Sequence, residues 1–80
     1  MFSMILAFLK PPLVEFLHER VDAAQLKYDW LKSRLDRAMI LLPQAAVSQE
    51  EVEQDQYLVD EAALALKGAQ KMLQWVQENF

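Results

Sequence analysis

The chain has 80 residues, of which 54% are hydrophobic and 25% charged, with 8 Lys and Arg against 12 Asp and Glu and a formal net charge of -4. This length is enough for one small domain, and the apolar content argues against a disordered chain. The lack of cysteine excludes a disulfide scaffold, a thiolate zinc site and cysteine catalysis, and a single glycine argues against a turn-rich sheet fold.

Residues 1–10 predict an apolar N-terminal arm ahead of a pair of prolines. This run is far shorter than the ~20 residues of a bilayer span, and it lacks the basic start and cleavage site of a signal peptide. We expect a short helix or arm that packs on the rest of the chain. Two alternatives stay open, an interfacial membrane anchor and an oligomerisation arm that grips a partner. The side chains that would serve such an arm are Phe2, Ile5, Leu6, Phe8 and Leu9.

Residues 12–42 predict a long helix, because proline is favourable at a helix start and no glycine or proline interrupts the next 30 residues. Apolar side chains recur at alternating steps of three and four, the seam pattern of a coiled coil. The seam consists of Val14, Leu17, Val21, Ala24, Tyr28, Leu31, Leu35, Ala38 and Leu42.

Residues 43–48 predict the connection between two helices. Pro43 disfavours helical geometry in the residue before it, so the first long helix should end there. Ser48 stands three residues before Glu51, the spacing of a capping box, in which the serine oxygen accepts from the Glu51 N–H and the glutamate reaches back. A second helix should therefore begin at Gln49.

Residues 49–79 predict a second long helix with a matching seam. Its members are Val52, Asp55, Val59, Ala62, Leu66, Ala69, Leu73, Val76 and Phe80. Folding the two seams together about the short loop places Leu35 opposite Val59 and Val14 opposite Phe80 in one unbroken antiparallel register. The predicted fold class is therefore all-α, an antiparallel helical hairpin with an N-terminal arm that dimerises into a four-helix bundle.

The hairpin leaves large apolar side chains outside its single seam. By helical periodicity they point away from the opposite helix, and contiguous exposed apolar surface commonly marks an interface. We expect partner binding through Leu26, Trp30, Ile40, Tyr57, Leu64, Gly68 and Trp75. Gly68 has two interpretations: a tolerated defect or local close packing, or a notch that admits a partner.

Candidate chemistry is sparse. Glu15 and His18 have the Glu-x-x-His spacing of di-metal helical bundles, and Glu78 lies near their level, but a solvated helix face explains them more simply. Asp55 in the seam is either a functional carboxylate or a polar residue that fixes the pairing of the helices. We therefore expect no catalytic residues, no metal and no cofactor.

Charge is uneven along the chain. Arg20, Lys27 and Arg34 form a basic edge on the first long helix, whereas residues 43–80 are strongly acidic. Interleaved aspartates and the negative net charge argue against nucleic acid as a partner. We expect a cytoplasmic, non-enzymatic protein that binds other proteins as an adaptor, co-chaperone or inhibitor, and that forms a homodimer or a higher homo-oligomer. The alternatives are a structural subunit of a larger helical assembly and a membrane-peripheral protein anchored by residues 1–9.

Overall fold

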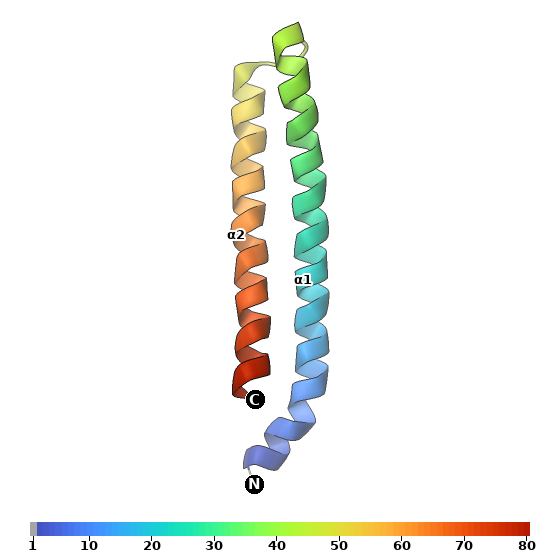
Figure 1. Cartoon of the computed structure of the whole chain (residues 1–80), viewed down its shortest axis with the longest axis vertical. Coiled ribbons are helices and arrows are strands. Elements are labelled where there is room, and N and C mark those ends of the chain that lie inside the picture. The colour runs from blue at the N-terminus through green and yellow to red at the C-terminus, as the bar shows by residue number, and fades with distance from the viewer. Residues whose placement is uncertain (1) are drawn as a thin grey trace.

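The fold is an antiparallel hairpin of two long helices (Figure 1). The computed structural model describes the backbone of residues 2–80 and the side chains of residue 5 and residues 7–80. Helix α1 spans Phe2–Leu41, a short 3₁₀ turn η1 spans Leu42–Gln44, and helix α2 spans Gln49–Asn79. The predicted all-α helical hairpin is confirmed, and α2 has the predicted bounds.

Helix α1 begins at Phe2 and runs through both prolines, so it does not begin at Pro12 as predicted. A proline lacks the backbone N–H, so Pro11 and Pro12 give no hydrogen bond to the carbonyl groups one turn before them. Their fixed φ is still close to the helical value, and such a pair can bend a helix without ending it. Figure 1 shows this bend in the first turns of α1.

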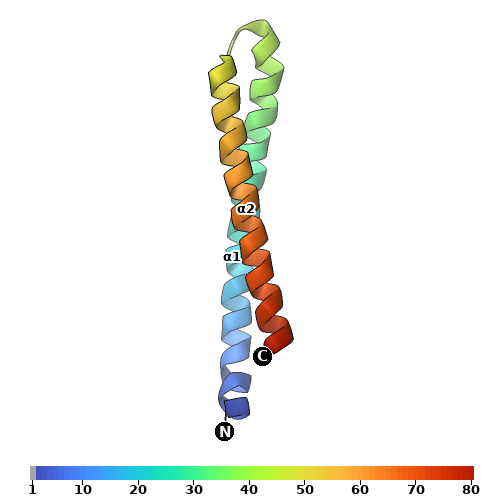
Figure 2. The ribbon, with the colours of Figure 1, turned by 90° about the vertical axis from the view of Figure 1, so that its left-hand side faces the viewer.

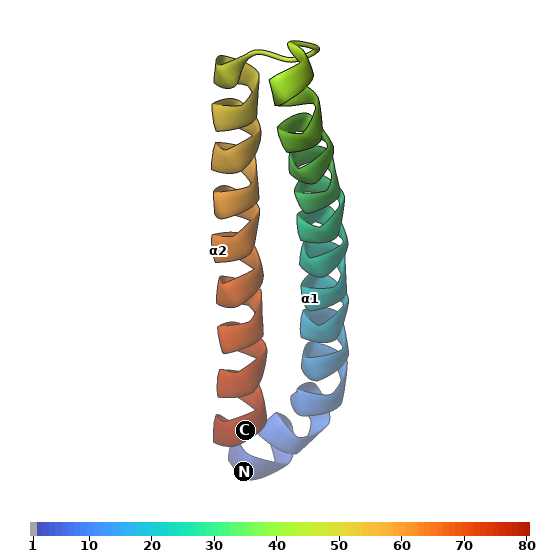
Figure 3. The same ribbon diagram turned by 45° about the horizontal axis from the view of Figure 1, so that its top comes forward.

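The bend carries the N-terminal turns of α1 toward the C-terminal end of α2, as Figures 1 and 3 both show. Lys10 Nζ donates a hydrogen bond to the carbonyl oxygen of Gln77 at 3.3 Å, which ties the bend to α2. The described apolar side chains of this arm do not pack onto the hairpin, because Ile5, Phe8 and Leu9 are exposed, Phe8 by 82%. The expected packing of the arm is therefore wrong for these three residues. The side chains of Phe2 and Leu6 lie outside the described residues.

The connection closes α1 with a Schellman motif. The N–H of Ala45 donates to the carbonyl of Leu42 at 3.0 Å, and the N–H of Ala46 donates to that of Leu41 at 3.3 Å. Ala45 adopts the left-handed conformation that this motif needs, with φ 57°. Helix α2 then begins as predicted, because Ser48 Oγ accepts a hydrogen bond from the Glu51 N–H at 3.1 Å. This is one of the two hydrogen bonds that the predicted capping box comprises.

The core is one seam between the helices. Every buried side chain among the described residues belongs to the two predicted seams. One cluster lies toward the loop and the other toward the open end of the hairpin. The first contains Leu31, Leu35, Val59 and Ala62, and the second contains Leu17, Leu73 and Val76. Seen edge-on, the helices cross each other gently along this seam, as in a coiled coil (Figure 2).

The molecule is long and thin, with extents of 64 × 13 × 12 Å and a radius of gyration of 18.3 Å. A compact chain of 80 residues has a radius of gyration of roughly 12 Å. Each helix therefore buries one stripe and leaves the rest of its circumference open to contact with other molecules.

Candidate functional site

A groove runs along one side of the hairpin, between α1 and α2. It consists of three successive hollows of about 540, 310 and 280 Å³, and the first two share Arg20 and Ala65. Its two edges are residues spaced seven apart, so each edge stays on one side of its helix over the whole length. We call this surface the groove face and define it by the edge residues Leu13, Arg20, Lys27, Arg34 and Leu41 of α1 and Glu51, Leu58, Ala65 and Met72 of α2.

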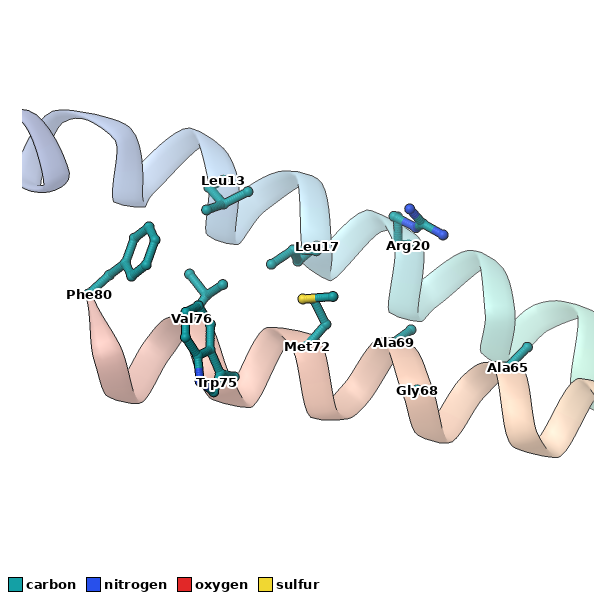
Figure 4. A pocket seen from close by; sticks show the side chains of 10 residues that line it. All are labelled: Leu13, Leu17, Arg20, Ala65, Gly68, Ala69, Met72, Trp75, Val76 and Phe80. Carbon is teal, nitrogen blue, oxygen red and sulfur yellow. The ribbon is translucent and has the colours of Figure 1, made fainter.

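The largest hollow lies at the open end of the hairpin (Figure 4). Its lining is mainly apolar, and Leu13 and Leu17 of α1 point toward α2 across it. Trp75 and Phe80 close its end with their rings edge to face, the centroids 5.8 Å apart. Aromatic pairs in this geometry are favourable and hold each other in place. The hollow is therefore a preformed apolar site.

Small residues line the middle of the groove. On α2 these are Ala65, Gly68 and Ala69, and on α1 they are Ala23 and Ala24. A Cβ atom built at Gly68 would meet no atom within 4 Å, so no close contact inside the chain requires glycine here. This finding removes local close packing within the chain as the explanation of Gly68. A tolerated defect and a notch for a partner both remain.

Aromatic side chains stand beside the groove with arginine against them. The Arg20 guanidinium lies 6.0 Å from the centre of the Phe16 ring, and that of Arg34 lies 5.9 Å from the centre of the Trp30 ring. Such cation–π contacts hold both partners in one orientation, at roughly 0.5–1 kcal/mol in exposed positions. Trp30 is nevertheless 58% exposed and Trp75 54% exposed. Both indoles thus offer large apolar surface on the groove side.

Charge divides the groove face between the two helices. The α1 edge carries Arg20, Lys27 and Arg34, whereas the α2 side carries Glu51 and Glu61. The seven-residue spacing keeps the aspartates and glutamates of α1 off this edge. One helix therefore presents cations and the other presents carboxylates.

Asp55 is 8% exposed, and its Oδ1 lies 3.3 Å from Arg34 Nε. The Arg34 guanidinium therefore places a positive charge beside this nearly buried carboxylate. A pair of this kind fits a residue that fixes the register of the helices.

The opposite side of the hairpin is polar. Its edge residues are His18, Gln25, Lys32 and Met39 of α1 and Gln56, Ala63, Gln70 and Gln77 of α2. Two of its glutamines are bonded along their own helices, Gln25 to Asp29 and Gln56 to Asp60, each at 2.9 Å. We call this surface the polar side. The two sides of the hairpin thus differ in chemistry although both flank the same seam.

The predicted partner residues fall into two groups. Trp30, Gly68 and Trp75 lie on or beside the groove face. The structure does not bring the remaining four into the groove, because they are exposed and lie on the sides of the helices that point away from the seam. These are Leu26, Ile40, Tyr57 and Leu64.

The sequence-based set of partner residues omitted several groove residues. Leu13, Leu58 and Met72 supply much of the apolar lining. For Leu58 and Met72 the signal in the sequence is the seven-residue spacing of Glu51, Leu58, Ala65 and Met72. This line is visible in the sequence beside the seam, but the predicted partner residues were those that point away from the seam.

The remaining candidates for chemistry are dispersed. Glu15 and His18 are exposed on α1, and Glu78 accepts a hydrogen bond from Gln74 at 3.0 Å. Among the side chains that the structure describes, no group of three His, Cys, Asp or Glu could hold a metal ion.

No helix in the described part of the chain combines the length and apolar character that crossing a bilayer requires.

Comparisons of the chain with protein families, with curated proteins and with solved structures found no match. Function is therefore inferred from the groove face itself.

Proposed function

We propose that this protein is a small non-enzymatic protein–protein interaction module that binds a partner through the groove face. The observation that supports this most directly is the continuous apolar groove with two half-exposed tryptophans beside it. Tryptophan and arginine dominate the residues on which protein interfaces depend, and a groove between helices is a common receptor for a partner helix.

The surface area of the chain supports the same proposal. The accessible area is 6313 Å², whereas a compact monomer of 9.3 kDa exposes about 5,000 Å². The excess is larger than the ~800 Å² that each partner buries in a standard protein–protein interface. Adaptor, co-chaperone and inhibitor are the roles that such a module fits, and the cytoplasm is the compartment we propose for it.

The test uses photo-crosslinking from the two sides of the hairpin. A photoreactive amino acid replaces Met72 in the groove in one variant and Gln70 on the polar side in the other. We expect protein crosslinks from position 72 and few from position 70, because the two positions lie on one helix but on opposite sides of the seam.

Two further variants complete this test. Trp30→Ala should abolish the crosslinks from position 72, whereas Met39→Ala, which removes an exposed apolar side chain on the polar side, should leave them unchanged. Equal crosslinking from positions 70 and 72 would contradict the proposal. Crosslinking from position 72 that Trp30→Ala does not reduce would contradict it as well.

A further inference from the structure

We infer that the partner on the groove face is a second copy of this chain, placed so that the two loops lie at the same end of a four-helix bundle. This inference rests on the proposed function and names the occupant of the same surface. In this arrangement α1 of one copy lies against α2 of the other, and the two-fold axis runs parallel to the helices.

Charge on the groove face selects this orientation. Two hairpins can stack their groove faces with the loops together or with the loops at opposite ends. With the loops apart, α1 packs against α1, so Lys27 meets its own copy and Arg20 comes opposite Arg34. Like charges in such positions oppose association. With the loops together, the basic edge of α1 meets the acidic side of α2 instead.

The levels of the residues match in the arrangement with the loops together. A two-fold axis parallel to the helices does not shift either copy along the bundle. A residue of α1 therefore lies at the same height as the same α2 residues in its own copy and in the second copy. The pairing of Leu35 and Val59 in one core cluster therefore places Arg34 and Arg37 within about one turn of the second copy's Glu61. Each dimer contains this charge pairing twice.

Shape complements charge at the middle of the groove. By the same register, Trp30 stands within one residue of the level of Ala65 in the second copy and about one turn from Gly68. The indole is large and half-exposed, and Gly68 leaves open space where a side chain would begin. Gly68, which destabilises its own helix relative to alanine, then accommodates a side chain of the second copy.

The first test mixes two charge variants that should each associate poorly alone. Arg37→Glu and Glu61→Arg both replace an attraction with a repulsion at both pairs of the dimer. We expect each to raise the dissociation constant about tenfold or more, since a change of 1.4 kcal/mol is tenfold. Mixed in equal amounts, the two variants should associate more tightly than either variant alone, because position 37 of each chain again faces an opposite charge at position 61 of the other.

If association recovers in the mixture, the two charges interact between chains. A folding defect within either variant would persist in the mixture. Lys32→Glu on the polar side is the control, and it should leave association unchanged. Circular dichroism checks that all three variants stay helical. A mixture that associates no better than its components would overturn the proposed pairing.

The second test measures the distance between the two loops. The chain has no cysteine, so Gln44→Cys offers one site for a spin label. Loops at the same end give a distance of ~20–25 Å between labels, about two helix diameters. A distance near the 64 Å length of the molecule would overturn the orientation, and a monomer at every concentration would overturn the second copy as occupant.

The two proposals can fail separately. A monomeric chain that crosslinks another protein from position 72 overturns the inference and leaves the proposed function standing. A chain in which position 72 crosslinks nothing overturns both.

Discussion

Ala45 has a backbone conformation that is unfavourable for alanine. Its φ of 57° and ψ of 20° lie in the left-handed region, which costs an L-residue about 1–2 kcal/mol. Glycine lacks the Cβ that causes this cost and is the usual residue at this position of a Schellman motif.

We therefore predict that Ala45→Gly raises the free energy of unfolding by ~0.5–1 kcal/mol, after the extra freedom of glycine in the unfolded chain is subtracted. Urea unfolding followed by circular dichroism measures the change. Ala46→Gly is the matched control, and it should lower stability, because no positive φ offsets the added freedom. A loss of stability in Ala45→Gly would contradict the account of this turn.

The ion pair of Arg34 and Asp55 makes the second prediction at this scale. Removing Arg34 strands a nearly buried carboxylate, so Arg34→Met should lower the free energy of unfolding by about 1–2 kcal/mol. The effect is smaller than for a fully buried pair because Arg34 is half exposed.

Adding Asp55→Leu to Arg34→Met should recover this loss, because leucine continues the apolar seam. Thermal unfolding of the single and double variants makes the comparison. Lys32→Met on the polar side serves as the control, because the structure gives Lys32 no ion pair among the described side chains. If Arg34→Met unfolds like the original chain, the ion pair contributes nothing to stability.

At the scale of elements, the seam is predictable because burial in a two-helix hairpin follows one simple rule. Only residues on the facing stripe can leave water, so the alternating steps of three and four mark them directly. Ser48 likewise marks the start of α2, because its side chain satisfies a backbone N–H that the helix itself leaves free.

Other elements escaped prediction for physical reasons. Pro12 is acceptable both as the first residue of a helix and as a bend inside one, and the sequence contains nothing local that decides between them. The left-handed position at Ala45 could not be predicted, because the sequence has alanine and not glycine there. The identity of the groove face needed the structure, because it depends on which flank of each seam faces the same side once the two helices pair.

At the scale of the whole molecule, a single seam leaves a thin rod with two unlike sides. The polar side carries several glutamines, whose side chains are well solvated by water. The groove face carries apolar, aromatic and basic groups that gain from a partner. A chain that buries so little surface by itself is expected to complete its packing through association.

The measurement that tests this account most directly is the molar mass in solution, by size-exclusion chromatography with light scattering at several concentrations. We predict a mass near twice 9.3 kDa for the unmodified chain and for Met39→Ala. Trp30→Ala and Trp75→Ala together should give a mass near that of one chain, since each indole contributes roughly 2 kcal/mol or more. A single-chain mass for the unmodified protein, or a two-chain mass for the tryptophan variant, would contradict it.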